Sequence, residues 1–253
     1  MNINITNSWL GVNNWLIDHI LPQLKWDISI DENLDLSMQG RYLMMCNHQS
    51  WVDTTVNQYF GLKRMPLTRF FTKWELIFIP FVGQAFKILG FPMMKRHTKQ
   101  QIANHPELKN KDMAEARKAC QQLLSQPFTL LNYLEGTRFT REKHQQQNSP
   151  YQHLLKAKAG GLALALNILG QDIDALVDMT IVYPDGAPNY HDFWLGDVSR
   201  IAVNMRKIEI PTWVYSGNYE EDPDFKERFQ HWVDQLWAEK DQLIKTMKER
   251  YSD

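Results

Sequence analysis

Short apolar runs that stop at polar or glycine-containing sequence are the feature that most constrains the fold of this chain. Residues 42–46, 128–134 and 177–183 each have the length and composition of one buried strand. Between them lie stretches whose apolar residues recur at helical spacing, such as residues 109–126. Strands that alternate with helices predict an α/β fold, with a single central, mostly parallel sheet flanked by helices.

A histidine follows the first of these runs, and an aspartate comes five residues after it. Open α/β sheets bind their ligands beyond the carboxyl ends of the strands, which is where His48 is expected. If the chain turns back, Asp53 can hold one ring nitrogen and leave the other free to take a proton from a hydroxyl. The same spacing also fits a capped turn with a surface aspartate, and spacing alone leaves both interpretations open.

A second signal follows the run at residues 128–134, which ends in Glu135, Gly136, Thr137 and Arg138. A glycine lets the backbone turn sharply, and the fork of an arginine guanidinium suits a phosphate. A base at one strand end and a phosphate-binding arginine at another predict a phosphorylated substrate that carries a hydroxyl.

Four short blocks resemble the glycerolipid acyltransferase family, which includes the lysophosphatidic acid acyltransferases, and they occur in the family's order. They are residues 47–53, 90–96, 135–138 and 182–184. The resemblance covers roughly residues 40–215. The end of the chain, with an acidic, Trp-rich helix, is most similar to the bacterial branch related to lysophosphatidate and lysocardiolipin acyltransferases.

The resemblance implies transfer of a fatty acyl group from acyl-CoA or acyl-ACP, as co-substrate, to the free hydroxyl of a lysophospholipid. It further implies that His48 acts as general base and that Asp53 fixes its tautomer. The first expected acceptor is 1-acyl-sn-glycerol-3-phosphate, which gives phosphatidic acid, and other lysophospholipids come next. No cofactor and no metal is expected, because the His, Asp and Glu residues form no ligand-spaced cluster. A thioesterase and a non-catalytic, membrane-associated lipid binder remain as alternatives.

The expected acceptor site is built around Arg138, which holds the phosphate. Gly136 permits the close turn, and Thr137 adds a hydroxyl donor. Glu135 orients Arg138 or the acceptor.

Two further groups are expected to bind substrate. Arg96, together with Lys95, adds positive charge from the end of a neighbouring strand at residues 90–96. By resemblance, Tyr183 and Pro184 shape the acyl-donor side.

Composition limits the partners and the compartment. The formal net charge is −1, so no global basic field favours nucleic acid. Two cysteines give no disulfide framework, which fits a reducing compartment. No window of about 18 apolar residues is present, so no membrane span is expected. The resemblance implies a membrane-associated protein at the cytoplasmic face of the inner membrane, and it leaves open whether the protein is peripheral or has a further N-terminal membrane segment. The expected partners are the membrane surface and, where acyl-ACP is the donor, an acyl carrier protein.

We expect an N-terminal amphipathic segment (residues 1–40), an α/β acyltransferase domain (residues 41–215) and a C-terminal helix packed on it (residues 216–253). The helix predicted within residues 8–25 either packs on the flank of the domain or lies at a membrane interface. The aromatic segment at residues 70–89 is either buried core or a surface that enters the bilayer or lines an acyl channel.

Three more local predictions follow from sequence pattern. Residues 26–40 are expected to form a polar hairpin or loop region with edge strands. Residues 141–150 are polar and Gln-rich, which predicts a loop. Asp222 and Pro223 are typical of a helix start, and the apolar stripe that follows is interpreted as core packing.

Overall fold

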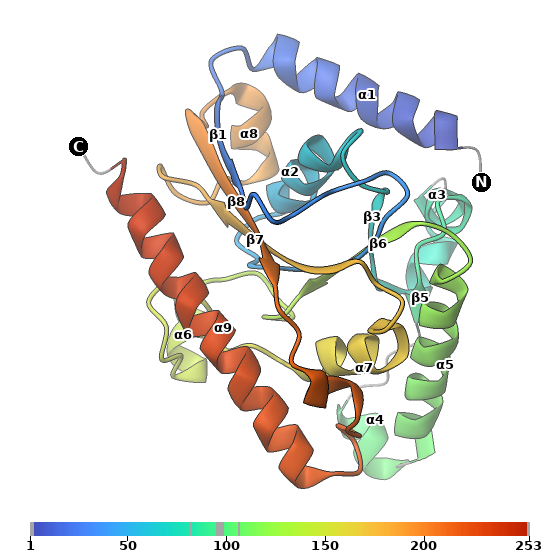
Figure 1. Ribbon diagram of the computed structural model, residues 1–253. Helices are drawn as coiled ribbons and strands as arrows, with labels where there is room; N and C mark the ends of the chain where they lie inside the picture. Colours follow the sequence, from blue (N-terminus) through green and yellow to red (C-terminus); the bar gives the residue numbers. More distant parts are fainter. Residues whose placement is uncertain (1–2, 81, 95–98, 106, 252–253) are drawn as a thin grey trace.

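The central sheet has six strands, and all but one pair of neighbours run parallel (Figure 1). The computed structural model describes residues 3–80, 82–94, 99–105 and 107–251. The strand order is β1 (Lys25–Ile30), β8 (Arg200–Ile208), β7 (Ala175–Val182), β2 (Arg41–Cys46), β6 (Phe128–Tyr133) and β3 (Thr68–Phe70). Only β7 and β8 pair antiparallel within it. The predicted α/β fold with a mostly parallel sheet is confirmed.

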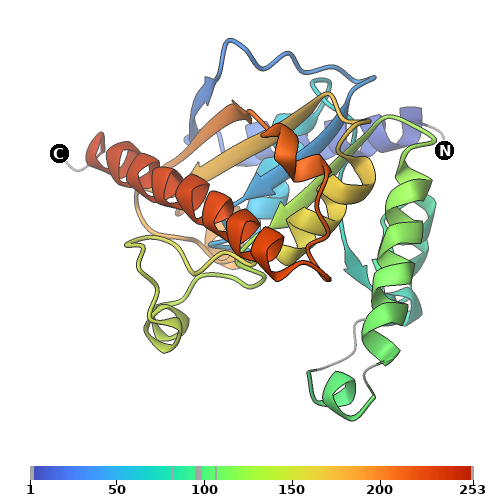
Figure 2. The ribbon, with the colours of Figure 1, turned by 60° about the horizontal axis from the view of Figure 1, so that its bottom comes forward.

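Helices cover both faces of the sheet. One face packs on α1 (Ile3–Ile20), α2 (Val52–Gly61) and α8 (Tyr190–Leu195). The other packs on α5 (Glu107–Leu123), α7 (Gly160–Leu169) and α9 (Pro223–Glu249), which lie on the near side in Figure 2. The remaining elements are α3 (Val82–Ile88), α4 (Lys99–Asn104), α6 (Arg141–Gln147), the 3₁₀ helices Trp74–Phe78 and Thr212–Tyr215, and the two-stranded sheet of β4 (Thr72–Lys73) with β5 (Met93–Met94).

Strand β2 shows why such short runs can form the centre of this sheet. Successive side chains of a strand point to opposite faces, and both faces are apolar here. Leu43 and Met45 belong to the core beneath α5, α7 and α9. Tyr42, Met44 and Cys46 belong to the core beneath α1, α2 and α8. A run without polar alternation is therefore what this position requires.

The parallel strands determine where the functional blocks meet. Strand β2 pairs in parallel with β6 on one side and with β7 on the other. Their carboxyl ends consequently lie at the same edge of the sheet. His48 follows β2, the segment 135–138 follows β6, and Tyr183 follows β7. Three separate parts of the sequence are thus brought together at one edge.

The segment predicted as a polar loop at residues 141–150 contains helix α6 instead. The side chain of Thr140 accepts a hydrogen bond from the backbone N of Lys143 and caps the helix start. Asn148 ends the helix in the left-handed conformation, with φ of 45°. The prediction was wrong because this helix is exposed and has no apolar stripe for the sequence pattern to reveal.

Two strand predictions also changed. The polar region before residue 40 contains an edge strand, β1, as expected, but no hairpin, because β1 pairs in parallel with the distant β8. The strand predicted at residues 90–96 is reduced to β5, which pairs with β4 outside the central sheet. Lys95 and Arg96 lie outside the described residues.

Helix α9 begins as predicted, and it is bound to the sheet by a buried ion pair. Asp222 accepts hydrogen bonds from the backbone N atoms of Asp224 and Phe225, each at 3.0 Å. Further along, Lys240 is fully buried, and its Nζ lies 2.6 Å from Oδ1 of Asp178 on β7. A buried charge must be paired, so this contact fixes how α9 lies against the sheet.

Within the described part of the chain, no helix combines the length and the apolar content needed to cross a bilayer. Helix α1 instead packs sideways on the domain through Leu10 and Ile17, which are buried. Its Trp9 and Trp15 remain about half exposed, at 46% and 57%. One stripe of this helix therefore packs on the flank of the domain, as the first interpretation predicted. The opposite stripe presents exposed tryptophans, as the membrane-interface interpretation requires.

We expect replacement of Lys240 by alanine to destabilise the protein strongly. Removing one member of a buried ion pair leaves a buried charge, and the expected loss is about 3 kcal/mol. The matched control is Lys245→Ala, since Lys245 is exposed and lies 4.0 Å from Glu249. Urea unfolding should show a change within about 0.5 kcal/mol for the control. Equal losses for the two variants would contradict the assignment.

Candidate active site

His48 stands just beyond the end of β2, on a backbone that is held from both sides. Asn47 extends the pairing with β7: its Oδ1 accepts from the N of Ile181 at 2.9 Å, and its Nδ2 donates to the O of Ile181 at 2.8 Å. The N of His48 donates to Oε1 of Glu135 at 2.7 Å, and its O accepts from the N of Phe139 at 2.7 Å. The imidazole therefore extends from a well-fixed position.

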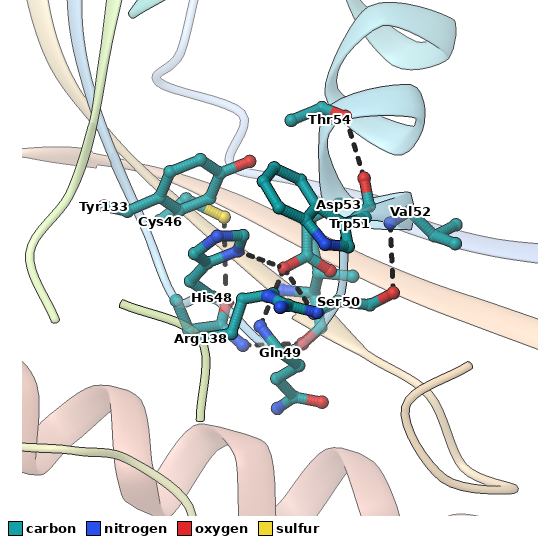
Figure 3. A network of polar contacts seen from close by, with 12 residues as sticks. Cys46, His48, Gln49, Ser50, Trp51, Val52, Asp53, Thr54, Tyr133 and Arg138 are labelled. Atoms are coloured by element: carbon teal, nitrogen blue, oxygen red, sulfur yellow. Dashed lines mark hydrogen bonds and ion pairs between the residues drawn. The ribbon is translucent and has the colours of Figure 1, made fainter. Parts of the chain in front are cut away.

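The imidazole is hydrogen-bonded to Asp53, which lies in the first turn of α2 (Figure 3). Nδ1 of His48 lies 2.8 Å from Oδ2 of Asp53, and the same oxygen accepts from the N atoms of Gln49 at 2.7 Å and Ser50 at 2.9 Å. Asp53 is fully buried, whereas the His48 side chain is 12% exposed. A proton on Nδ1 leaves Nε2 as the acceptor, and no described residue bonds Nε2.

Aromatic rings set the orientation of the imidazole. The ring of Tyr133 stacks on it, with centroids 4.0 Å apart and planes 19° apart. Trp51 lies at its edge, with the centroids 6.5 Å apart. The guanidinium of Arg138 lies over the Trp51 ring, with Cζ 4.8 Å from the centroid, and Figure 3 shows the two side by side. The tryptophan thus links the base to the predicted phosphate-binding arginine.

A cavity of about 380 Å³ lies at this edge of the sheet. Its lining comprises His48, Trp51, Phe70, Phe71, Leu131, Asn132, Tyr133, Gly136, Thr137 and Arg138. The histidine from one strand end and the turn from the next therefore face the same space. A substrate in this cavity can contact the base and the guanidinium together.

The turn at residues 136–138 is surrounded by positive charge. Gly136 has φ of 68°, and a Cβ built on it would lie 3.0 Å from Nζ of Lys158. The positive φ requires glycine here, and the contact shows how closely Lys158 approaches the turn. Lys143 donates to Oγ1 of Thr137 at 2.7 Å and to the O of Arg138 at 3.1 Å. Three cations from different segments thus gather at one turn, which favours an anionic group there.

Glu135 does not face this cavity, contrary to the role that the sequence suggested. It is fully buried, and its oxygens accept from the backbone N atoms of His48 at 2.7 Å and Leu155 at 2.9 Å. Burial raises the pKa of the Glu135 carboxyl to about 7, although the two amide donors lower it. Glu135 braces the backbone of the base and does not reach Arg138 or an acceptor.

Tyr183, which was predicted to shape the acyl-donor side, contacts the carboxylate of Asp53 in the structure. It is buried, and its hydroxyl donates to Oδ1 of Asp53 at 2.7 Å. Its O accepts from the N of Gly186 at 3.1 Å in the turn that contains Pro184. Pro184 is partly buried in that turn. Within the block at residues 182–184, Tyr183 therefore supports the His48–Asp53 pair through its hydroxyl. The predicted contributions of Lys95 and Arg96 fall outside the described residues.

Sequence reasoning gave no functional role to several residues that build the site. Tyr133, Trp51 and Asn47 contact or position the imidazole, and Lys143 contacts the cationic turn. Asn47 and Trp51 lie inside the His48 block, so their proximity was a usable signal. No local pattern shows that Tyr133 stacks on a ring from the neighbouring strand.

A second, larger cavity of about 680 Å³ lies beside the first. Phe70 lines both cavities, so they share a wall. The larger one is bordered by α1, α2, α3 and α8. Its apolar lining includes Trp9, Ile17, Phe86, Ile88 and Trp194, and α2 contributes polar residues. The segment at residues 70–89 is thus not simply buried core: Phe78 is 76% and Ile88 is 69% exposed. Phe86 and Ile88 of this segment line the cavity, and Phe78 is exposed.

No cluster of three or more His, Cys, Asp or Glu side chains suitable for a metal occurs among the described residues. The chemistry visible in the cavity is that of a single imidazole base, a carboxylate that orients it, and cations nearby. Such a set suits proton removal from a hydroxyl beside an anionic group.

Comparison with known proteins places this arrangement in a family. The sequence model of the Acyltransferase family matches residues 26–184, more than half of the chain. The chain belongs to the acyltransferase family. All four blocks noted above fall inside that match or at its end. This family assignment confirms the resemblance stated from the sequence.

Named relatives of this acyltransferase-family chain are distant. A probable 1-acyl-sn-glycerol-3-phosphate acyltransferase 5 of Arabidopsis thaliana is 23% identical over 250 residues, which cover 94% of this chain and 60% of that protein. Lysocardiolipin acyltransferase 1 of Gallus gallus is 23% identical over 221 residues, which cover 83% of this chain and 54% of that protein. The chain therefore spans little more than half the length of these relatives.

The fold is shared with a solved structure. The crystal structure of the 1-acyl-sn-glycerophosphate acyltransferase from Thermotoga maritima aligns with a TM-score of 0.52 at 15% identity. The alignment covers 93% of this chain and 79% of that chain. At this identity the comparison supports the α/β fold of this acyltransferase-family chain.

The raised pKa of Glu135 predicts a pH-dependent contribution to stability. Between pH 4.5 and 7 the native state holds this proton more tightly than the unfolded state, so stability present below pH 4.5 is lost as the pH rises through 7. We expect this loss to be roughly 1–3 kcal/mol. It should be absent from Glu135→Gln, so denaturant unfolding of both proteins across this range isolates residue 135. Parallel pH profiles would refute the prediction.

Proposed function

We propose that this protein transfers a fatty acyl group from an acyl thioester to the free hydroxyl of a lysophospholipid. The single observation that carries the proposal is that the free Nε2 side of His48 and the guanidinium of Arg138 face one cavity. A hydroxyl and an anionic group on the same small molecule can occupy both positions. Family membership and the names of the relatives support the same reaction class.

In the proposed reaction, Nε2 of His48 removes the proton of the acceptor hydroxyl as its oxygen attacks the thioester carbonyl. Asp53 keeps the proton on Nδ1 and stabilises the imidazolium that forms. The tetrahedral intermediate then collapses, the carbon–sulfur bond breaks, and the departing thiolate takes the proton from the imidazolium. General base catalysis of this kind is worth about 10²–10⁴ in rate. No covalent enzyme intermediate is required.

The acceptor phosphate is assigned to the cationic turn. Arg138 supplies a planar fork of donors, and Trp51 beneath it limits its rotation. Lys143 and Lys158 add charge around the same turn. The favoured acceptor is 1-acyl-sn-glycerol-3-phosphate, with phosphatidic acid as product. A different lysophospholipid is the alternative acceptor, and similarity to a lysocardiolipin acyltransferase motivates it.

The larger, apolar cavity is assigned to an acyl chain. It shares Phe70 with the cavity that contains His48, so a chain within it would end near the base. Burying each methylene of such a chain contributes about 0.8 kcal/mol. Acyl-CoA and acyl-ACP both deliver a thioester, and measuring thiol release from each of them identifies the donor.

Contact with a membrane surface completes the proposal. Trp9, Ile88 and Trp194 line the apolar cavity and are 46%, 69% and 36% exposed, respectively. Exposed apolar and indole groups around a cavity favour the interfacial region of a bilayer, where lysophospholipids reside. A position at the cytoplasmic face of the inner membrane is part of this proposal.

We expect His48→Ala to reduce acyl transfer at least 100-fold while the protein remains folded, because the base is lost. Release of free thiol from acyl-CoA or acyl-ACP, with and without lysophospholipid, measures the reaction. The control is His105→Ala, since His105 also lies near a carboxylate, at 3.2 Å from Glu107, but on the surface. Activity above a few per cent of wild type in His48→Ala would sink the base assignment. Thiol release that ignores the lysophospholipid would indicate a thioesterase.

We expect Arg138→Ala to raise the KM for the phosphorylated acceptor roughly tenfold or more, because a charged hydrogen bond is lost. The KM for the acyl donor should change little. The surface variant Arg117→Ala on α5 controls for the loss of one positive charge. A KM effect confined to the thioester would remove Arg138 from the acceptor site.

A further inference from the structure

The carboxylate of Asp53 is hydrogen-bonded unequally at its two oxygens. Oδ2 accepts from Nδ1 of His48 and from the backbone N atoms of Gln49 and Ser50. Oδ1 accepts only from the hydroxyl of Tyr183, at 2.7 Å, among the described residues. Because Asp53 is fully buried, water cannot replace a missing donor at Oδ1. One phenol therefore determines whether this oxygen is satisfied.

Tyr183 reaches Asp53 from a neighbouring strand whose position is fixed. It is the first residue after β7, which pairs in parallel with β2. The side chain of Asn47 bonds both backbone groups of Ile181, two residues before Tyr183. This pairing ties the end of β7 to the residue that precedes His48. The phenol oxygen is thus placed by the sheet and not by the loop that contains the base.

We propose that Tyr183 is a positioning residue for acyl transfer: its hydroxyl holds Oδ1 of Asp53 and so fixes the carboxylate that orients His48. The inference rests on the base role of His48 in the proposed function. Tyr183 is 1% exposed and lines neither the His48 cavity nor the apolar cavity, so it touches no substrate there. It acts through Asp53 alone.

Two physical effects give this bond its importance. Without the phenol, the Asp53 carboxylate can rotate about its Cβ–Cγ bond, and the bond to Nδ1 loses its alignment. A carboxylate that has lost a donor also retains more negative charge toward the imidazole, so the imidazolium is stabilised more strongly. Burial, followed by the charge of Asp53, raises the pKa of the Tyr183 phenol well above its usual value. The hydroxyl therefore stays protonated and remains a donor.

Other titratable groups surround the pair and are the same in every variant described below. Tyr133 ends β6, Glu135 follows that strand, and Cys46 lies on β2. The guanidinium of Arg138 lies over the ring of Trp51, and Trp51 in turn packs edge to face with the imidazole of His48. Of these groups, Glu135 has its pKa raised by burial to about 7, within the pH range over which activity would be measured. The role of Tyr183 is therefore read from the difference between the pH–activity profiles of two variants, and not from one profile alone.

The test compares Tyr183→Phe with Tyr42→Phe. Tyr42 is equally buried, at 1%, and its hydroxyl accepts from the N of Ser37 at 2.7 Å, in the segment that precedes β2. We expect Tyr183→Phe to lower kcat roughly 10- to 100-fold, with the KM of both substrates unchanged. The acid limb of its kcat/KM profile should move to higher pH, whereas Tyr42→Phe should leave kcat and the limb in place.

An unchanged acid limb in a folded Tyr183→Phe protein overturns the inference, as does an equal shift in Tyr42→Phe. If Tyr183→Phe does not fold, 3-fluorotyrosine introduced at position 183 alone replaces it. This analogue has almost the same shape and is a stronger donor, so it should move the acid limb to lower pH. No movement in this isosteric protein also overturns the inference.

A readout without substrate separates this inference from the proposed function. The His48 ring resonances, assigned by their loss in His48→Ala, can be titrated by NMR in wild type and Tyr183→Phe. The titration midpoint should rise in Tyr183→Phe and should not move in Tyr42→Phe. Absence of acyl transfer by wild type to every lysophospholipid would end the proposed function, while this midpoint would still decide the role of Tyr183.

Discussion

The buried carboxylate of Asp53 is the group on which the rest of the site depends. It is removed from solvent, so every hydrogen bond that stabilises its charge must come from the fold. The donors are the imidazole of His48, two backbone amides of the turn before α2, and the phenol of Tyr183 beyond β7. The turn, the helix start and the neighbouring strand must all be in place before the base is oriented.

The site combines a rigid base with exposed cations. His48 is fixed by Glu135, Asn47 and the strands beneath it, whereas Arg138 and Lys158 stand at the exposed rim. Rigid placement suits proton transfer, which requires close alignment, and exposed cations suit the capture of an anionic head group from solvent or an interface. The adjoining apolar cavity fits the remaining part of a lipid.

The sequence pattern predicted helices and strands well where buried residues repeat at a regular period. It predicted them poorly where polar contacts determine the start and end of an element. The strands β2, β6 and β7 and the helix α9 were predicted, because apolar runs and an Asp-Pro start are local signals. Helix α6 was missed, because it is defined by its caps and is exposed. The strand predicted at residues 90–96 is longer than the observed β5, because apolar residues beside basic ones do not reveal which sheet they join.

The sequence by itself determined the α/β class and the residue types at each strand end, because these depend on neighbours within a few residues. It left the pairing of His48 with Asp53 open, because the same spacing also fits a capped turn with a surface aspartate, and the structure decided it by burying Asp53 against the imidazole. Only the tertiary structure decided which way the polar side chains face. Glu135 turns inward to the backbone of His48, and Tyr183 turns toward Asp53, although both were assigned to substrate. Their partners come from other strands of the sheet, and no local pattern encodes the face on which such distant groups meet.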